Sequence, residues 1–468
     1  MPQGADLVVV GAGPGGYTAA LEAAAQGRSV TLVDARGAAG VGGVCLLEGC
    51  IPSKALIELS VARHDESNRT AMGLVQRGEP QVDLATFQRW KHSIVSALGD
   101  GVRGRLAKAG VDVVEGWASF TGPRTLRVER TGQASMLLEF DHAVVATGST
   151  ASSVPALDRA DERVLDAAGV LDLDQCPSSV VVVGGGYIGV ELGTALRKLG
   201  AQVTVIEATD RLLPTLDPSL GQEVARGLRR LGCDVRLSST VTGLVDDGVL
   251  YTDGEQERLV AAAAVVVAVG RRPATTGLGL ERAGVTLTSS GHVSVDASCL
   301  ATDRIAAIGD VVPGPALAHK ATAEARVAVE ALAGRPVRAD QLVPLVVFSD
   351  PEVACIGLSL TQAEQAGYRA SEAALPISFA GRAAVLQQRA GTVRLVVDDD
   401  TGLLLGGSVV GPHATELIAE LVLAVECGLQ VGDVAGAIHP HPTLSELVGE
   451  TALTVTNVFT APPMRGIA

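Results

Sequence analysis

Aromatic residues are scarce in this sequence, since tryptophan, tyrosine and phenylalanine make up 3% of its 468 residues. Long apolar runs are also missing: the longest, 259–270, falls short of the ~20 residues that a membrane-spanning helix needs. No positively charged segment precedes the first apolar strand, so we expect no secretory signal and a cytoplasmic location. Basic residues are not in excess, and a net charge of −15 argues against nucleic acid or an anionic membrane as a partner.

Cysteine is sparse as well, but two of the seven cysteines, Cys45 and Cys50, are separated by only four residues. Two sulfurs at this spacing can close a small ring without straining the chain. Pro52 suits the first turn of a helix, so Cys50 would lie near unpaired backbone N–H groups and the positive end of the helix dipole. That environment, with Lys54 one turn away, favours a thiolate. The pattern indicates a redox-active pair, although two unrelated buried thiols or half of a metal site share the same spacing.

A metal site is the weaker of these alternatives. No second cluster of cysteine and histidine follows at the spacing of a zinc site, so we expect no metal. The other five cysteines stand alone in apolar segments, and we interpret them as inert core thiols: Cys176, Cys233, Cys299, Cys355 and Cys427.

A dinucleotide-binding pattern opens the chain. A valine-rich strand at 6–10 runs directly into a motif with the glycines Gly11, Gly13 and Gly16. The next strand ends on Asp34, 34 − 16 = 18 residues after the third glycine. In such a pattern the glycines permit a tight turn and close approach of a pyrophosphate, the helix N-terminus neutralises it, and the acid binds ribose hydroxyls.

The same pattern recurs 184 − 11 = 173 residues later, which implies a second nucleotide-binding unit. Its acid is Glu207, 207 − 189 = 18 residues after the third glycine. A carboxylate at this place would repel a 2′-phosphate, so NAD is preferred over NADP. Arg211, which follows, could contact a phosphate or be a solvated charge. The glycines of this second motif are Gly184, Gly186 and Gly189.

The rest of the chain predicts the fold class. Buried strands at 142–146 and 264–269 close the two units, and a third strand ends at Asp310. From residue 343 onwards, alternating apolar strands and the helices 416–427 and 444–456 predict an antiparallel α+β region. The sequence therefore predicts an α/β fold with two Rossmann-like dinucleotide-binding domains and a C-terminal α+β domain.

The C-terminal region holds one more chemical motif. His441 lies on a proline-braced loop, and Glu446 follows five residues later. The carboxylate can hold one ring nitrogen while the other acts outward as a base. The same stretch also fits an ordinary helix start in which Thr443 and Glu446 form a capping box. We interpret His439, just before this pair, as structural.

Taken together, these motifs resemble the flavoprotein disulfide reductases, the class I pyridine nucleotide-disulfide oxidoreductases, over nearly the whole chain. The resemblance implies an FAD-binding domain at 1–150 and 275–342, an NAD-binding domain at 151–274, and a dimerisation domain at 343–468. It is carried by segments 11–17, 42–56, 146–149, 184–193, 270–273, 307–311, 317–321, 348–354, 411–418 and 439–446.

The resemblance also assigns cofactor contacts. For FAD it implies Asp34 at the adenosine ribose, Asp310 near the ribityl chain and Lys54 by the flavin ring. For NAD it implies Glu207 at the ribose and Tyr187 shielding the nicotinamide pocket. It further implies an ion pair between Lys54 and Glu191 of the second unit, and cofactor contacts along both glycine motifs. Additional cofactor-binding positions that it implies are Thr147, Gly148, Glu191, Gly270 and Ala318.

The activity implied by the resemblance is oxidation of protein-bound dihydrolipoamide to lipoamide through Cys45, Cys50 and FAD, with hydride passed to NAD. His441, oriented by Glu446, would be the base, and in a homodimer it would serve the disulfide of the other subunit. No lipoyl domain precedes Gly11, so we expect the lipoyl group on a partner. That partner would be the acyltransferase of a 2-oxo acid dehydrogenase complex or the lipoyl carrier protein of the glycine cleavage system.

Several positions depart from the family pattern without removing a reacting atom: Val44, Leu47, Asp34 and Pro440 stand where Thr, Asn, Glu and Ala are usual. Glutathione-type reductases would need arginines where Glu207 stands. Mercuric reductases end in a vicinal cysteine pair, which is missing from the tail 460–468. A flavin-bearing docking subunit that is no longer an enzyme should have lost at least one reacting residue. All four are present in this sequence: Cys45, Cys50, His441 and Glu446.

Overall fold

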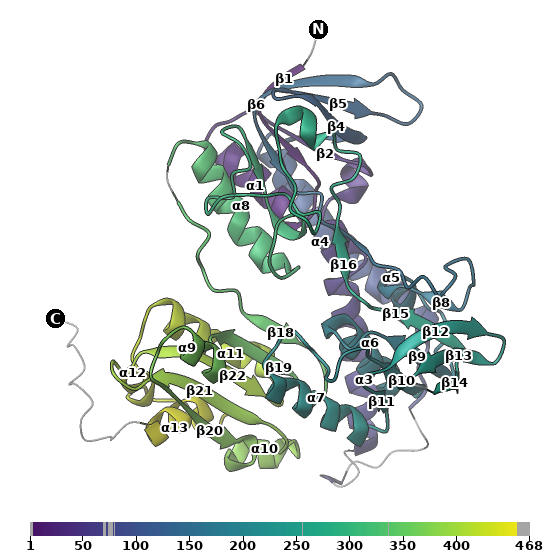
Figure 1. Cartoon of the computed structure of the whole chain (residues 1–468), viewed down its shortest axis with the longest axis vertical. Coiled ribbons are helices and arrows are strands. Elements are labelled where there is room, and N and C mark those ends of the chain that lie inside the picture. The colour runs from purple at the N-terminus through teal and green to yellow at the C-terminus, as the bar shows by residue number, and fades with distance from the viewer. Residues whose placement is uncertain are drawn as a thin grey trace.

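The computed structural model describes residues 3–68, 72–73, 78, 80–254, 256–335 and 337–455. Figure 1 shows an upper lobe that contains the N-terminus and a lower part in which further sheets lie side by side. Within the described ranges, no helix is both long and apolar enough to cross a membrane. The tail 460–468, which we used to set mercuric reductases apart, lies outside the described residues.

The upper lobe is built on a seven-stranded sheet in the order β3-β2-β1-β6-β5-β4, with β17 also paired to β6. β1, β2, β3, β6 and β17 run parallel, whereas β4 and β5 form an antiparallel meander. Its strands are β1 (Gln3–Val10), β2 (Val30–Asp34), β3 (Asp112–Glu115), β4 (Trp117–Gly122), β5 (Thr125–Glu129), β6 (Met136–Val145) and β17 (Ile305–Ala307).

Both faces of this sheet are covered. This explains why β1 has consecutive valines and no alternation of apolar and polar residues at its end. One face packs against α1 (Pro14–Ala25), α4 (Leu84–Lys108) and α8 (Ala318–Leu332), and the other packs against the meander. The strand expected at 142–146 is the end of the longer strand β6. β17 brings the chain back to this sheet after the second unit.

The second unit repeats the arrangement with a five-stranded parallel sheet in the order β11-β10-β9-β15-β8. A three-stranded antiparallel sheet lies beside it, and β7 pairs with β16 where the chain passes between the units. The elements are β7 (Ser149–Ala151), β8 (Val164–Leu165), α5 (Ala167–Leu171), β9 (Ser179–Val183), α6 (Tyr187–Lys198), β10 (Gln202–Ile206), α7 (Pro218–Arg230), β11 (Asp234–Arg236), β12 (Thr240–Val245), β13 (Gly248–Thr252), β14 (Glu257–Ala261), β15 (Ala264–Val267) and β16 (Arg271–Pro273).

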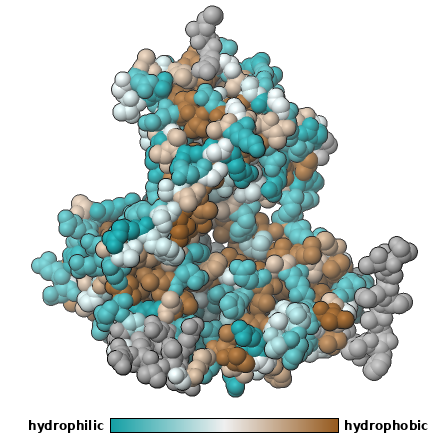
Figure 2. Space-filling model, turned by 180° about the vertical axis from the view of Figure 1, so that it is seen from behind, coloured by the Kyte–Doolittle hydropathy of each residue, from teal (hydrophilic) through white to brown (hydrophobic). Residues whose placement is uncertain are grey.

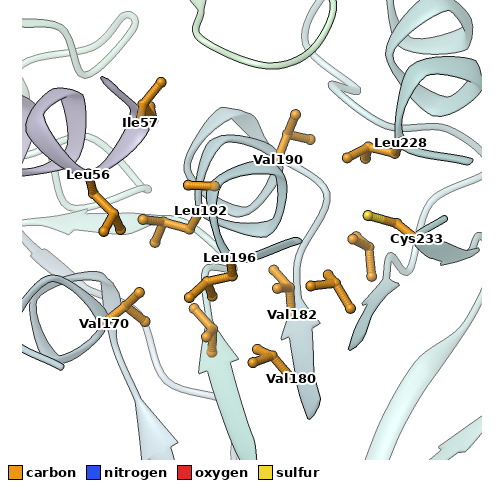
Figure 3. Packing of buried hydrophobic residues seen from close by; sticks show 14 of the residues in the cluster. Leu56, Ile57, Val170, Val180, Val182, Val190, Leu192, Leu196, Leu228 and Cys233 are labelled. Carbon is orange, nitrogen blue, oxygen red and sulfur yellow. The ribbon is translucent and has the colours of Figure 1, made fainter. Parts of the chain in front are cut away.

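The helix that begins at Cys50 packs on this second unit. α2 (Gly43–Leu47) and α3 (Cys50–Asn68) follow β2 in sequence, yet Leu56 and Ile57 of α3 belong to the core formed by α6 and β9. Figure 3 shows the α3 side chains facing Leu192 and its neighbours on α6. A segment from the first part of the chain therefore completes the core of the second.

The C-terminal unit is a five-stranded antiparallel sheet in the order β18-β19-β22-β21-β20, covered by α11 and α13. Some of its large hydrophobic residues are exposed, including Leu423 and Ile438. Figure 2 shows hydrophobic residues at the surface where the upper lobe meets the lower part. The elements are β18 (Leu345–Val347), β19 (Val353–Gly357), α9 (Leu360–Gln365), β20 (Ala370–Pro376), α10 (Gly381–Leu386), β21 (Thr392–Asp398), β22 (Leu404–Val410), α11 (Ala414–Glu426), α12 (Val431–Ala435) and α13 (Glu446–Val455).

Two helical glycines should respond in opposite ways to alanine. Alanine is favoured over glycine in a helix interior by about 1 kcal/mol. A Cβ at Gly104 in α4 would meet no atom within 4 Å, so Gly104→Ala should raise the thermal midpoint. A Cβ at Gly227 in α7 would lie 2.2 Å from the backbone oxygen of Asp350, so Gly227→Ala should lower it. Circular dichroism melts would measure both, and a higher midpoint for Gly227→Ala would contradict the tight contact.

Candidate active site

The cysteine pair lies at the junction of two helices. Cys45 is in the short helix α2, and Cys50 is the first residue of α3, as the sequence predicts. Both are free thiols in the structure. A hydrogen bond from the Cys45 thiol, followed by the charge of Lys54, lowers the pKa of Cys50 from 9.0 to about 7. The same hydrogen bond and burial raise the pKa of Cys45 well above its usual range. Cys50 is therefore the sulfur that carries the negative charge.

Lys54 is held by an acid and an aromatic ring from two other parts of the chain. Its Nζ donates to Oε2 of Glu191 in α6 at 2.8 Å and lies 4.5 Å from the centre of the Phe348 ring. The Phe348 N–H donates to the other carboxylate oxygen of Glu191 at 3.0 Å. Glu191 is buried, so both of its oxygens need these partners. Sequence reasoning gave Phe348 no chemical role, because nothing local connects it to Lys54.

The acids of the two nucleotide motifs make matching contacts. Asp34 accepts from the N–H of Ala12 at 3.0 Å, and Glu207 accepts from the N–H of Gly185 at 2.6 Å. Each donor is the second residue of its glycine motif. Each acid also accepts from the N–H two residues further along, at 2.9 Å for Asp34 and 2.8 Å for Glu207. The two acids thus hold their glycine loops in the same way.

The glycine loops leave room where a pyrophosphate would bind. A Cβ on Gly11 would lie 2.3 Å from the backbone oxygen of Ala146, so this position must be glycine. The N-cap residues of α1 and α6, Gly13 and Gly186, place no side chain on the first turn of their helices. The N–H groups of that turn are therefore available to an anion. Both loops fit the phosphates of a dinucleotide.

Asp310 is fixed at the end of β17 by a buried ion pair. Lys320 and Glu324 of α8 contact each other at 2.7 Å. Glu324 accepts from the Gly309 N–H at 2.7 Å, and Lys320 donates to the Gly309 oxygen at 3.3 Å. Both backbone groups of the residue before Asp310 are thereby bound. The burial of this ion pair under the turn depends on how α8 packs, so the local sequence could not predict it.

A second chain of hydrogen bonds reaches Asp310 from the linking strands. Arg271 in β16 donates to the Ser149 hydroxyl at 2.6 Å, and that hydroxyl donates to Asp310 at 2.5 Å. Thr147 donates to the Ala274 oxygen at 2.8 Å across the same junction. The remaining predicted residues of this region lie at the ends of strands and the starts of helices. They are Gly148 after β6, Gly270 after β15, Tyr187 at the start of α6 and Ala318 at the start of α8.

His441 and Glu446 form the pair expected from the sequence. The Nδ1 of His441 lies 2.8 Å from one carboxylate oxygen of Glu446, while the other oxygen accepts from the Thr443 N–H at 2.8 Å. These hydrogen bonds lower the pKa of Glu446, so the carboxylate stays ionised beside the ring. The catalytic and helix-start interpretations of Glu446 are therefore compatible. The His441 side chain is 78% exposed and its second nitrogen is free to act outward.

Within one chain the two reacting groups are apart. No hydrogen bond or ion pair between described residues joins Cys45 or Cys50 to His441 or Glu446. Figure 1 shows α13 at one side of the C-terminal unit and α3 beyond its opposite side. A single copy therefore presents His441 and the sulfur pair on separate surfaces.

Two minor interpretations have clear outcomes. Cys233 and Cys299 are buried, whereas Cys427 is exposed, so its interpretation as a core thiol was wrong. It is the C-cap residue of α11, where the helix leaves the core. Arg211 pairs with Asp210 at 3.3 Å and is 38% exposed, which fits a solvated charge.

Comparison with known families defines the class. Residues 5–325 match the model for pyridine nucleotide-disulphide oxidoreductases. Residues 343–452 match the model for the dimerisation domain of the same proteins. The chain therefore belongs to the pyridine nucleotide-disulphide oxidoreductase family, and the predicted resemblance and fold class are confirmed.

Individual relatives narrow the class further. The chain is 42% identical over 460 residues to dihydrolipoyl dehydrogenase of Halobacterium salinarum, covering 96% of each sequence. It is 41% identical to dihydrolipoyl dehydrogenase of Geobacillus stearothermophilus, covering 96% of this chain and 95% of that protein. Among solved structures, LpdA from Mycobacterium tuberculosis is similar with a TM-score of 0.87 and 28% identity, covering 97% of this chain and all of that one.

The pH dependence of Cys50 alkylation tests the charge assignment. In the reduced protein the rate should rise with a midpoint near pH 7, because the thiolate is the reacting form and is protonated as pH falls below that value. Lys54→Met should move the midpoint upward, whereas Lys108→Met, an exposed lysine at the end of α4, should leave it in place. Iodoacetamide labelling followed by mass spectrometry measures this, and a midpoint near pH 9 in the unsubstituted chain would refute the assignment.

Proposed function

We infer that this chain is a flavoprotein that oxidises protein-bound dihydrolipoamide to lipoamide and reduces NAD to NADH. It is an NAD-dependent oxidoreductase, and its cofactors are FAD and NAD. The observation that carries this conclusion is the cysteine pair of unequal acidity, Cys45 and Cys50, beside Lys54. The near full-length similarity to dihydrolipoyl dehydrogenases supports the choice of substrate.

For the cofactors we propose the residues that the glycine loops support. FAD would be held by Gly11, Gly13 and Gly16, with Asp34 at its ribose, Asp310 at the ribityl chain and Lys54 by the ring; this unit would comprise 1–150 and 275–342. NAD would be held in 151–274 by Gly184, Gly186 and Gly189, with Glu207 at the ribose. The matched contacts of Asp34 and Glu207 support this division. When bound, FAD takes an electron pair from the dithiol and gives hydride to NAD.

The chain's own residues would move the protons and exchange the sulfurs. His441, held by Glu446, takes a proton from one thiol of the substrate. The resulting thiolate attacks Cys45, the Cys45–Cys50 bond breaks, and Cys50 leaves as a thiolate next to Lys54. The second substrate thiol then displaces Cys45, which closes the cyclic disulfide and leaves two reduced cysteines. The low pKa of Cys50 supports its part as the leaving group.

The C-terminal unit is a dimerisation domain, so the working protein is a homodimer. We propose that His441 of one subunit serves the cysteines of the other, which the separation of the two groups within one chain supports. The partner would be a lipoyl-bearing acyltransferase or a lipoyl carrier protein. We propose that the protein works in a reducing compartment such as the cytoplasm, where dithiol substrates stay reduced.

An apolar cavity beside α2 supports an aliphatic substrate arm. Its volume is about 480 Å³, and it lies between the turn after β2 and helix α4. Leu47, two residues after Cys45, lines it together with Val95, His92 and Arg103. We propose that the hydrocarbon part of the lipoyl group binds here, and that Leu47 favours this contact where an asparagine would be polar.

The first test is NADH formation from free dihydrolipoamide. With NAD we expect rapid turnover, and with NADP much less, because Glu207 repels a 2′-phosphate. Cys50→Ser should lower the rate at least about a thousandfold, as loss of a residue that takes part in the chemical step does in other enzymes. Cys233→Ser, a buried thiol in another unit, is the control and should retain the rate. If the unsubstituted chain reduces a dye with NADH but does not oxidise dihydrolipoamide, the substrate assignment is wrong.

A second test addresses the cavity. Leu47→Ser removes apolar contact worth roughly 1–2 kcal/mol, so KM for dihydrolipoamide should rise about tenfold. Dye reduction by NADH should stay unchanged, since that reaction does not use the cavity. Leu98→Ser, an exposed leucine of α4 that does not line the cavity, is the matched control. An unchanged KM in Leu47→Ser would place the substrate arm elsewhere.

A further inference from the structure

His439 is tied to two helices of the C-terminal unit. Its Nε2 lies 2.8 Å from Oε1 of Glu420 in α11, and its side chain is only 11% exposed. The opposite side of the ring contacts α13, because a Cβ added to Gly449 would lie 2.6 Å from Nδ1. An ionised carboxylate can only accept, so Nε2 carries the proton in this hydrogen bond. The ring is therefore fixed between α11 and α13 from both sides.

The same short segment carries His441 into solvent. Only Pro440 separates the two histidines, and the proline ring restricts rotation of the backbone between them. The Pro440 oxygen accepts from the Thr443 hydroxyl at 2.7 Å, which closes the loop on itself. His441 is 78% exposed, in contrast to the part-buried His439. His439 thus fixes the position from which the exposed histidine extends.

The contact between the base and Glu446 does not fix the loop on its own. Glu446 is the first residue of α13 and lies in the same short stretch as His441. That hydrogen bond orients the ring within the stretch, whereas the bond from His439 to Glu420 joins the stretch to α11. Ile438, on the other side of His439, is 99% exposed and supplies no anchor. His439 is therefore the residue that joins the start of the loop to α11.

We propose that His439 and Glu420 are positioning residues that set the reach of His441 toward the disulfide. The inference rests on the proposed function of His441 as the base. A base displaced by about 1 Å can lose up to two orders of magnitude in rate. The pair acts through His441 and does not touch the substrate.

Variants with and without the hydrogen bond test the proposal. His439→Ala and Glu420→Ala should lower dihydrolipoamide turnover about tenfold or more, because the loop loses its link to α11. His439→Gln retains an N–H donor and should recover much of the rate. NADH-driven dye reduction, which bypasses His441, should stay within about twofold in every variant. Glu364→Ala, an exposed acid of α9 in the same unit, is the matched control.

A second readout needs no dihydrolipoamide. The pKa of Cys45 lies well above its usual range, so its alkylation by iodoacetamide near pH 7 needs a base that removes the thiol proton. In protein reduced by NADH, this alkylation, measured at Cys45 by mass spectrometry, should therefore be slower in His439→Ala, as it should be in His441→Gln. If the unsubstituted chain ignores dihydrolipoamide but this difference is seen, the substrate assignment fails and the positioning stands. Equal alkylation rates, or a parallel fall of turnover and dye reduction with loss of flavin, would overturn the positioning role.

Discussion

The ion pair between Lys54 and Glu191 is the contact on which the arrangement of the site depends. It joins the helix that carries Cys50 to helix α6 of the second unit, and Phe348 adds the C-terminal unit. A buried carboxylate is stable only when it is paired and hydrogen-bonded, so Glu191 requires both partners. The same lysine lowers the pKa of Cys50. The charge of Lys54 therefore contributes both to the contacts among the three units and to the low pKa of Cys50.

The two nucleotide-binding units hold their glycine loops with the same pattern of hydrogen bonds. In each, an acid at the end of the second strand accepts from the second residue of the glycine loop and from the N–H two residues further along. The acid is thus held by backbone N–H groups, and the loop keeps its open N-terminal turn. The surroundings of the two loops differ, because only the first unit has Asp310, which follows the Gly309 that Lys320 and Glu324 hold.

Sequence reasoning succeeded where the determinants are local. The strand that ends on Asp34 and the pairing of His441 with Glu446 were predicted because both depend on residues close in sequence. The contact of Phe348 with Lys54 and that of His439 with Glu420 were not, since each joins distant segments with no local signal. β4 was missed because Trp117–Gly122 pairs only with the neighbouring meander strand and leaves Trp117 exposed. Exposure of Cys427 likewise depends on where α11 ends.

Helix α3 has a consequence for how such a protein could be divided or recombined. By position in the sequence it belongs with the first unit, but its Leu56 and Ile57 fill the core beside α6. A segment 151–274 cut out as a module would present that apolar face to water, and a foreign second unit grafted in its place would have to match α3. The units are thus interlocked in sequence, and exchange of a nucleotide-binding unit must carry the cysteine helix with it.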